Sequence, residues 1–209
     1  NGRPLELNRL EPVSDAILEI WQPGVNGALP MAGILSGRIN PSGKLAMTFP
    51  YSTGQIPIYY NRRKSGRGHQ GFYKDITSDP LYPFGHGLSY TSFDYGKGRL
   101  SKSSMKSDGK VTLTVPVTNT GDRKGDEIVQ VYVKALDYPE APIKSLRGFQ
   151  KLSLAPGETA KASITLDGEA FEYYDPSIDE LSTRPGRYQI LYGCSSRDED
   201  LQSIDFVVK

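Results

Sequence analysis

The stretch VTLTVPVT, residues 111–118, alternates apolar and polar side chains along its length. Its valines and Leu113 fall on one face, whereas its threonines and Pro116 fall on the other. A period of two residues is typical of a half-buried β-strand. Because Pro116 has no N–H to donate to a neighbouring strand, we expect this strand to lie at a sheet edge or to carry a bulge.

Similar segments follow as far as the C-terminus. Residues 129–133 read VQVYV, with valines on one side and Tyr132 on the other. The pair Pro185-Gly186 marks one of several turns, and Tyr188 just after it is a candidate tyrosine corner. Strands with frequent turns predict an immunoglobulin-like or fibronectin type III-like sandwich over residues 92–209.

The beginning of the chain has a different pattern. Residues 16–21, AILEIW, predict a buried strand, residues 27–35 a helix, and residues 44–49 a second short strand. Strand, helix and strand form the end of an α/β layer, but residues 1–50 are too few to close one. We therefore expect apolar surface to be exposed on Trp21 and on the helix, since their pattern is one of burial.

Residues 51–91 form an irregular connector between these two parts. Within it, residues 61–69 read NRRKSGRGH, with tyrosines and a phenylalanine on both sides. Such a run fits a ligand-contacting loop, a groove for single-stranded nucleic acid, or a solvated loop whose arginines pair with acids of a neighbouring domain. We favour the last interpretation. Loops of this length are either functional or disordered.

Composition excludes several classes of protein. The chain has 25 basic and 24 acidic residues, so net charge indicates neither nucleic-acid nor membrane-surface binding. Its single cysteine, Cys194, excludes an internal disulfide, and two histidines make a histidine-based metal site improbable. No segment approaches the roughly 20 apolar residues of a membrane span. Because the chain opens on Asn1 without a methionine, we expect it to be cut from something longer.

Catalytic constellations are equally scarce. The aromatic stretch YPFGHGLSYTSFDY, residues 82–95, contains His86, but no serine near it stands in a G-x-S-x-G elbow. Paired carboxylates for glycoside hydrolysis cannot be assigned, because no spacing among the acidic residues singles out a pair. We interpret His86 as a packed or hydrogen-bonded residue at a seam between two domains.

Several motifs occur in an order that resembles a known family. GRPLEL, AILEIWQPGVNGALPMAGILSGRINPSGKLAMTFP and YPFGHGLSYTSFDY resemble glycoside hydrolase family 3, and in particular periplasmic β-glucosidases. VTNTGDRKGDEIVQVYV, LRGFQKLSLAPGET and PGRYQILYG resemble the fibronectin type III-like domain that ends many of these enzymes. The resemblance covers essentially the whole chain.

This resemblance implies a barrel domain with an aspartate nucleophile, then an α/β sandwich with a glutamate acid/base, then the fibronectin-like domain. It implies retaining hydrolysis of terminal non-reducing β-D-glucosyl residues, with no cofactor and no metal. The order of motifs places both catalytic carboxylates before Asn1, so no catalytic residue is assigned. The expected partners are the N-terminal barrel, the rest of the α/β sandwich, a β-glucoside or oligosaccharide, and a second copy in a homodimer. The expected location is periplasmic or secreted.

In this family the substrate pocket opens between the barrel and the α/β sandwich, so the connector is placed to reach its rim. On that basis we predict that Tyr60, Arg62, Arg63 and His69 lie near the substrate. Two alternatives stay open. One is a carbohydrate-binding module that works alone, with Tyr173 and Tyr174 as its platform, and the other is a structural interaction domain.

Overall fold

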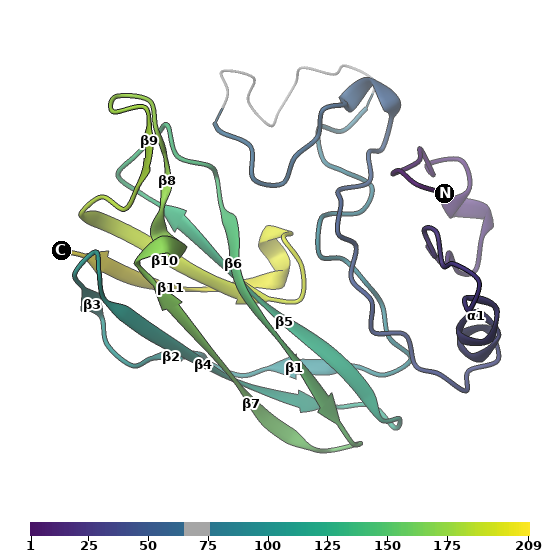
Figure 1. The fold of residues 1–209 in the computed structure, drawn as a ribbon. Helices are drawn as coiled ribbons and strands as arrows, with labels where there is room; N and C mark the ends of the chain where they lie inside the picture. The colour runs from purple at the N-terminus through teal and green to yellow at the C-terminus, as the bar shows by residue number, and fades with distance from the viewer. Residues whose placement is uncertain (65–75) are drawn as a thin grey trace.

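The computed structural model describes residues 1–64 and 76–209, so the predicted site residue His69 lies outside the described residues. A β-sandwich begins at Phe93 and continues almost to the C-terminus, while the earlier residues form an extended arm beside it (Figure 1). We use the name arm for residues 1–64 and 76–92. The predicted fold class, a β-sandwich preceded by the remainder of an α/β unit, is confirmed.

The first sheet is built around the strand predicted from the alternating pattern. This strand, β4, has β7 on one side, while β1 and β2 share its other side, all antiparallel. Along β4 the apolar residues are buried and the threonines half-buried, as the pattern predicts. The bounds are β1 Phe93–Tyr95, β2 Arg99–Leu100, β4 Lys110–Asn119 and β7 Thr159–Asp167.

The prediction that Pro116 marks an edge strand or a bulge is wrong, because β4 lies between neighbours and its register with β7 is unbroken through Pro116. Pro116 is accommodated where the strand beside it is interrupted, between Tyr95 at the end of β1 and Arg99 at the start of β2. There the carbonyl of Pro116 accepts a hydrogen bond from the N–H of Gly96 at 2.9 Å, and no donor is needed in return.

The second sheet has the order β3-β11-β10-β5-β6, in which β3 and β11 are parallel and the other pairs antiparallel. A separate two-stranded hairpin, β8–β9, stands beside the sandwich (Figure 1). The bounds are β3 Ser104–Met105, β5 Gly125–Ala135, β6 Ser145–Leu154, β8 Tyr173–Asp175, β9 Glu180–Ser182, β10 Gly186–Gly193 and β11 Leu201–Val208.

The inward faces of the two sheets form one apolar core. Burial of this kind is the main source of stability in a sandwich, at about 25 cal/mol per Å² of apolar surface. Its members include Val111, Leu113, Val115, Val117, Val129, Val131, Leu154, Ile164, Leu166, Phe171, Tyr188, Ile190 and Phe206. The hydroxyl of Tyr188 donates back to the carbonyl of Arg184 at 2.7 Å, which is the geometry of the predicted tyrosine corner.

The arm contains one α-helix, α1 (Ala28–Leu35), which agrees with the predicted helix and lies at the end of the arm far from the sandwich (Figure 1). The predicted strand over residues 16–21 is wrong, because this segment belongs to none of the described strands and pairs with none of them. The predicted strand over residues 44–49 is reduced to a single bridge between Phe49 and Tyr82. Short 3₁₀ turns complete the described structure at Glu11–Val13, Thr53–Gln55, Gly168–Phe171 and Asp198–Asp200.

Candidate functional site

Two segments of the arm run side by side against the sandwich. Leu45 exchanges backbone hydrogen bonds of 2.8 Å with Gly85 and His86, and Phe49 does so with Leu81 and Tyr82 at 2.9–3.4 Å. The segment around Gly85 lies over the face of β5 that carries Gln130 and Tyr132, whereas Lys44 reaches Glu127 on the valine-bearing face near the start of the strand. We call this junction the seam, and define it as residues 44–49 and 81–87 of the arm together with Glu127, Gln130 and Tyr132 of β5.

The seam contains a buried ion pair. The ammonium of Lys44 lies 3.1 Å from the carboxylate of Glu127, whose side chain is 4% exposed. The ammonium also donates to the carbonyl of Gly87 at 3.0 Å, and the hydroxyl of Tyr95 donates to Glu127 at 2.7 Å. The carboxylate therefore has a charged and a neutral donor, as a buried charge requires.

A second polar group of β5 holds the other side of the seam. The side-chain amide of Gln130 donates to the carbonyls of Gly85 at 3.0 Å and Cys194 at 2.6 Å, and it accepts from the hydroxyl of Tyr132 at 2.6 Å. Gly85 has φ +80°, and a Cβ there would lie 2.1 Å from the Gln130 side-chain oxygen. Any other residue here would strain the backbone and displace the Gln130 side chain.

His86 is a packed residue, in agreement with its interpretation from sequence. Its ring stacks on that of Tyr82 with the centroids 5.2 Å apart. Burial lowers the pKa of His86, and the positive charges of Arg197 and Lys44 lower it further. The imidazole is therefore held neutral between an aromatic ring and nearby cations, which suits packing at the seam.

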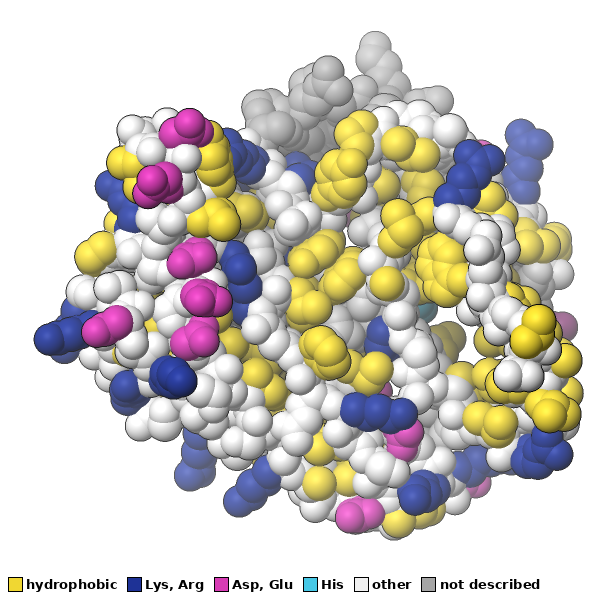
Figure 2. All heavy atoms as spheres, viewed as in Figure 1, with side chains coloured by type: hydrophobic (Ala, Val, Ile, Leu, Met, Phe, Trp, Pro, Cys, Tyr) yellow, Lys and Arg dark blue, Asp and Glu magenta, His cyan; other side chains and the backbone are white. Residues whose placement is uncertain are grey.

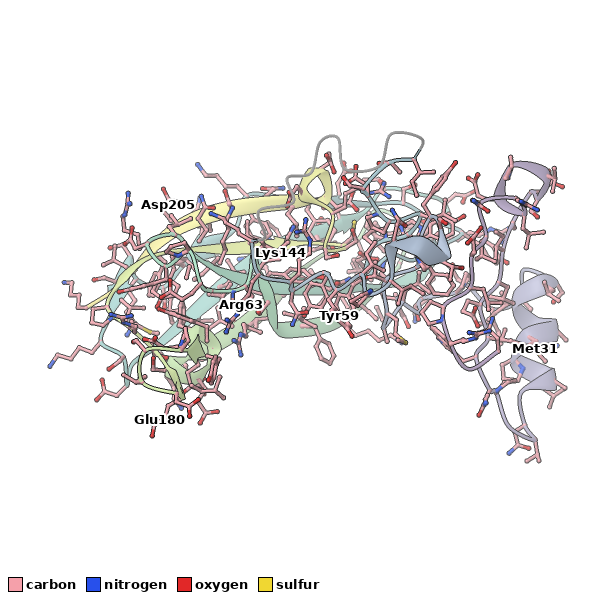
Figure 3. The ribbon with its side chains drawn as sticks, turned by 90° about the horizontal axis from the view of Figure 1, so that it is seen from above. Met31, Tyr59, Arg63, Lys144, Glu180 and Asp205 are labelled. Atoms are coloured by element: carbon pink, nitrogen blue, oxygen red, sulfur yellow. The ribbon has the colours of Figure 1, made fainter. Side chains whose placement is uncertain are left out.

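Two of the predicted substrate residues contact the sandwich. The ring of Tyr60 stacks on Phe84 at 4.2 Å and meets Tyr132 edge-on at 5.9 Å, and its hydroxyl accepts the N–H of Leu146 at 3.1 Å. Arg63 lies 5.5 Å from the ring centroid of Tyr174. In Figure 3, Arg63 lies on the side toward the hairpin that carries Glu180.

Between these two anchors, the backbone carbonyl of Arg62 accepts the N–H of Ile143 at 2.9 Å, so the connector is tied to the sandwich at three successive points. The structure brings Tyr60, Arg62 and Arg63 together at one edge of the sandwich. Whether they meet substrate stays a prediction.

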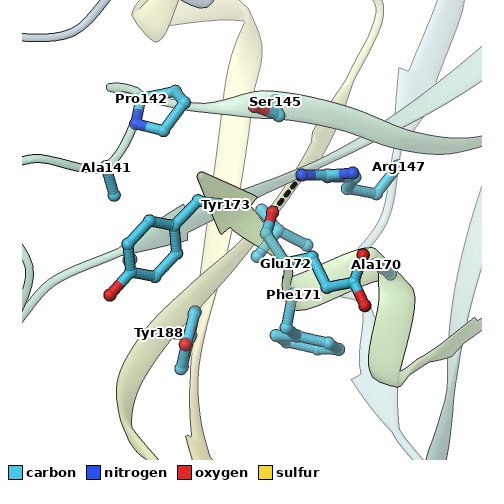
Figure 4. A pocket seen from close by; sticks show the side chains of 11 residues that line it. Ala141, Pro142, Ser145, Arg147, Ala170, Phe171, Glu172, Tyr173 and Tyr188 are labelled. Carbon is cyan, nitrogen blue, oxygen red and sulfur yellow. Dashed lines mark hydrogen bonds between the residues drawn. The ribbon is translucent and has the colours of Figure 1, made fainter. Parts of the chain in front are cut away.

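The predicted sugar platform of Tyr173 and Tyr174 does not form. Tyr173 is 4% exposed and packs against Tyr138, with the ring centroids 5.4 Å apart, whereas Tyr174 is 41% exposed. The ring of Tyr173 lines a small pocket inside the sandwich, beside Phe171 and Tyr188 (Figure 4). Arg147 donates to the carbonyl of Glu172 at its wall, so this pocket belongs to the packing of the hairpin rather than to an open surface.

Two hydrogen-bonded carboxyl groups of the sandwich have pKa shifts opposite to the shift that a general acid needs. Hydrogen bonds from Ser177 lower the pKa of Asp175, and hydrogen bonds from Arg187 lower that of Asp137. A glycosidase acid needs the opposite shift. Among the described residues, no group of three or more histidine, cysteine or acidic side chains is placed to hold a metal ion. In the same part of the chain, no helix is long and apolar enough to cross a membrane.

The arm exposes the apolar surface that its pattern predicts. Val25 is 98% exposed, and Leu29 and Leu35 of α1 are each 76% exposed. Figure 2 shows hydrophobic side chains gathered over the part of the molecule formed by the arm. Trp21 is half-buried instead of exposed, because its ring packs against Phe49 with the centroids 5.9 Å apart. The sandwich thus buries its own apolar side chains, whereas the arm leaves several of its apolar side chains exposed.

These features define a class of protein, in which a fibronectin-like sandwich packs against the last part of an α/β domain. Residues 1–90 match the family described as glycosyl hydrolase family 3 C-terminal domain, and residues 127–196 match the fibronectin type III-like domain. The chain therefore belongs to glycoside hydrolase family 3. In this family it corresponds to the C-terminal part of multidomain enzymes.

Named relatives agree with this assignment. The chain is 41% identical to a periplasmic β-glucosidase of Salmonella typhimurium, over 94% of this chain and 27% of that protein. It is also 41% identical to a xylan 1,4-β-xylosidase of Xylanibacter ruminicola, over 98% of this chain and 23% of that protein. The chain thus spans about a quarter of the length of these relatives.

Solved structures show the same fold over the whole chain. A β-glucosidase from Listeria innocua in complex with glucose has a TM-score of 0.90 at 37% identity, covering 100% of this chain and 30% of that one. A β-glucosidase from Erythrobacter marinus has a TM-score of 0.91 at 41% identity, covering 100% and 27%.

Sequence reasoning missed the polar groups of the seam. Glu127 and Gln130 stand in a strand of valines, and the structure buries both of them against the arm, Glu127 against Lys44 83 positions away and Gln130 against Gly85 45 positions away. One indication was available, because an acid and an amide lie within an otherwise apolar strand. Such residues are seldom buried without a partner.

Proposed function

We propose that the chain serves as the C-terminal part of a β-glucosidase that removes terminal non-reducing β-D-glucosyl residues with retention. The observation that carries this proposal is the contrast between the closed core of the sandwich and the exposed apolar side chains of the arm, such as Leu29 and Leu35. Those side chains have the pattern of a domain interior, and a folded enzyme would bury them against the preceding domains.

In this proposal the arm completes the α/β sandwich domain, and the sandwich supports it through the seam. We keep the division into residues 1–50, 51–91 and 92–209 as part of the proposal. The aspartate nucleophile and glutamate acid/base belong to the preceding domains, and they would stand about 5–5.5 Å apart, as retention requires. The chemistry needs no cofactor. The connector residues Tyr60, Arg62, Arg63 and His69 are the proposed link to the substrate.

A chimera tests this function directly. The matching C-terminal 27% of the Salmonella typhimurium enzyme is replaced by this chain, and hydrolysis of an aryl β-glucoside is measured. We expect activity from the chimera and none from the truncated relative or from this chain alone. Hydrolysis by the chain alone would overturn the proposal that both catalytic carboxylates lie elsewhere.

A β-xylosidase is the second candidate, because the relative from Xylanibacter ruminicola is as similar as the β-glucosidase. The two sugars differ by one hydroxymethyl group, and such a difference is decided by the pocket of the complete enzyme. The ratio of kcat/KM for aryl β-glucoside and aryl β-xyloside, measured on the natural polypeptide, separates the two candidates.

We further propose a periplasmic or secreted location, in line with the periplasmic relative. Cell fractionation with an antibody to this chain tests it. A stand-alone carbohydrate-binding role is less well supported, because Tyr173 of the supposed platform is buried. Binding of a β-glucan by the isolated chain would revive that alternative. We also propose that the complete enzyme, rather than this chain alone, forms a homodimer. Light scattering on the complete enzyme measures its mass and tests this.

A further inference from the structure

The connector enters the edge of the sandwich through a set of contacts that a solvated loop would not need. Tyr60 lies between Phe84 of the arm and Tyr132 of β5, with ring centroid distances of 4.2 Å and 5.9 Å. Its hydroxyl accepts a backbone N–H from Leu146 in β6. An aromatic ring with both a stacked and an edge-on partner is restricted in orientation, and its hydroxyl adds a directional constraint.

Three residues later, the connector is held a second time. The guanidinium of Arg63 lies 5.5 Å from the ring centroid of Tyr174, and it donates to the carbonyl of Tyr174 at 3.3 Å. Arg63 also forms an isolated backbone bridge with Pro142. Tyr174 belongs to the hairpin β8–β9, which is outside both sheets of the sandwich.

We infer that, within this proposed link to the substrate, Tyr60 and Arg63 act as positioning residues rather than as substrate contacts: through them the sandwich fixes the path of the connector and so acts on substrate binding from a distance. This inference rests on the proposed function. The hairpin β8–β9 then has a role of its own, since Tyr174 holds Arg63 in place. Arg62, whose carbonyl is fixed between the two anchors, keeps the proposed role near the substrate.

The first test measures position without activity. Hydrogen–deuterium exchange of residues 58–64 is followed in the complete 209-residue chain. A cation–π contact at an exposed site contributes about 0.5–1 kcal/mol, so Tyr174→Ala should speed exchange about two- to fivefold. Tyr174→Phe keeps the ring and should leave exchange unchanged. Ile178→Ala, at the exposed end of the same hairpin, is the matched control.

The second test measures the consequence for substrate, in the chimera with the Salmonella typhimurium enzyme. Tyr174→Ala should raise KM about two- to fivefold with little change in kcat, and Tyr174→Phe should restore it. Arg63→Ala removes both the ring contact and the hydrogen bond to the Tyr174 carbonyl, so Arg63→Ala combined with Tyr174→Ala should raise KM no further than Arg63→Ala alone.

Each outcome decides the inference. Unchanged exchange in Tyr174→Ala overturns the positioning role, and raised exchange with unchanged KM overturns its link to substrate. Additive effects of the two substitutions would show that Arg63 and Tyr174 act separately, which also contradicts it. If the chimera with the unaltered chain is inactive, the proposed function fails instead, and the exchange measurement still decides the positioning role.

Discussion

The ammonium of Lys44 and the carboxylate of Glu127 lie 3.1 Å apart, and this buried ion pair joins the arm to the sandwich. Both side chains are withdrawn from water, so the pair is stable only while each charge keeps its partner. An ion pair of this kind also fixes the register between two segments, since a displaced arm would leave Glu127 uncompensated.

Replacing Glu127 with alanine should destabilise the chain by about 3–5 kcal/mol, because Lys44 then becomes a buried, unpaired charge. The matched control is Asp126→Ala, one residue earlier, whose partner Lys151 is 55% exposed. An exposed pair contributes only about 0–1 kcal/mol. Urea unfolding measures both variants, and equal losses would contradict the assigned role of the buried pair.

Gly85→Ala should be costly for two reasons. The residue has φ +80°, which costs a non-glycine residue about 1–2 kcal/mol, and the new Cβ would lie 2.1 Å from the Gln130 side-chain oxygen. Displacing Gln130 should raise the total to about 3 kcal/mol or more. Gly157→Ala is the control, with φ +73° and nothing within 4 Å of the added Cβ. Gly157→Ala should lower the free energy of unfolding, measured in urea, by less than Gly85→Ala does. An equally large decrease would argue that the contact with Gln130 does not contribute.

His86 predicts a pH dependence of stability. Burial lowers the pKa of His86 in the folded state below the ordinary value of about 6.5, so the unfolded state binds more protons just below that pH. Stability should therefore rise with pH through this window, and fall as the pH drops below 6.5 toward the folded pKa. Thermal unfolding followed from about pH 5 to about pH 8 measures this pH dependence. His86→Phe keeps a ring against Tyr82 and should remove this part of the dependence; an unchanged profile would assign it to other groups.

Local pattern was sufficient for the sandwich but not for the seam. The strand of residues 111–118 could be predicted because the alternation of its own side chains decides which of them are buried. Only the position of Pro116 was predicted wrongly. The break in the neighbouring strand that accommodates it leaves no signal in the sequence of β4. Residues 16–21 carry the pattern of a buried strand, yet a strand also needs neighbours to accept its hydrogen bonds. Gln130 lies on the face of β5 that alternation leaves for solvent. The segment that covers it, around Gly85, is some 45 residues away in the chain, so no local pattern contains that contact.

The exposed side of α1 provides the last prediction. Leu29→Glu with Leu35→Lys should leave the isolated chain as stable as before, within about 0.5 kcal/mol per residue, because both side chains are exposed and each charge suits its end of the helix. In the chimera the same substitutions should lower the thermal midpoint of activity. Burying one leucine contributes about 1.5–3 kcal/mol, and an introduced charge would oppose that burial.

The control for these two substitutions is Ile178→Glu, since Ile178 is 53% exposed but belongs to the turn of the hairpin β8–β9 rather than to the arm. It should leave both the isolated chain and the chimera unaffected. If the α1 substitutions also leave the chimera unaffected, the helix does not face a neighbouring domain, and the arm must meet the rest of the enzyme through another surface. A loss of stability in the isolated chain would instead mean that α1 is packed within this chain, against the exposure of Leu29 and Leu35.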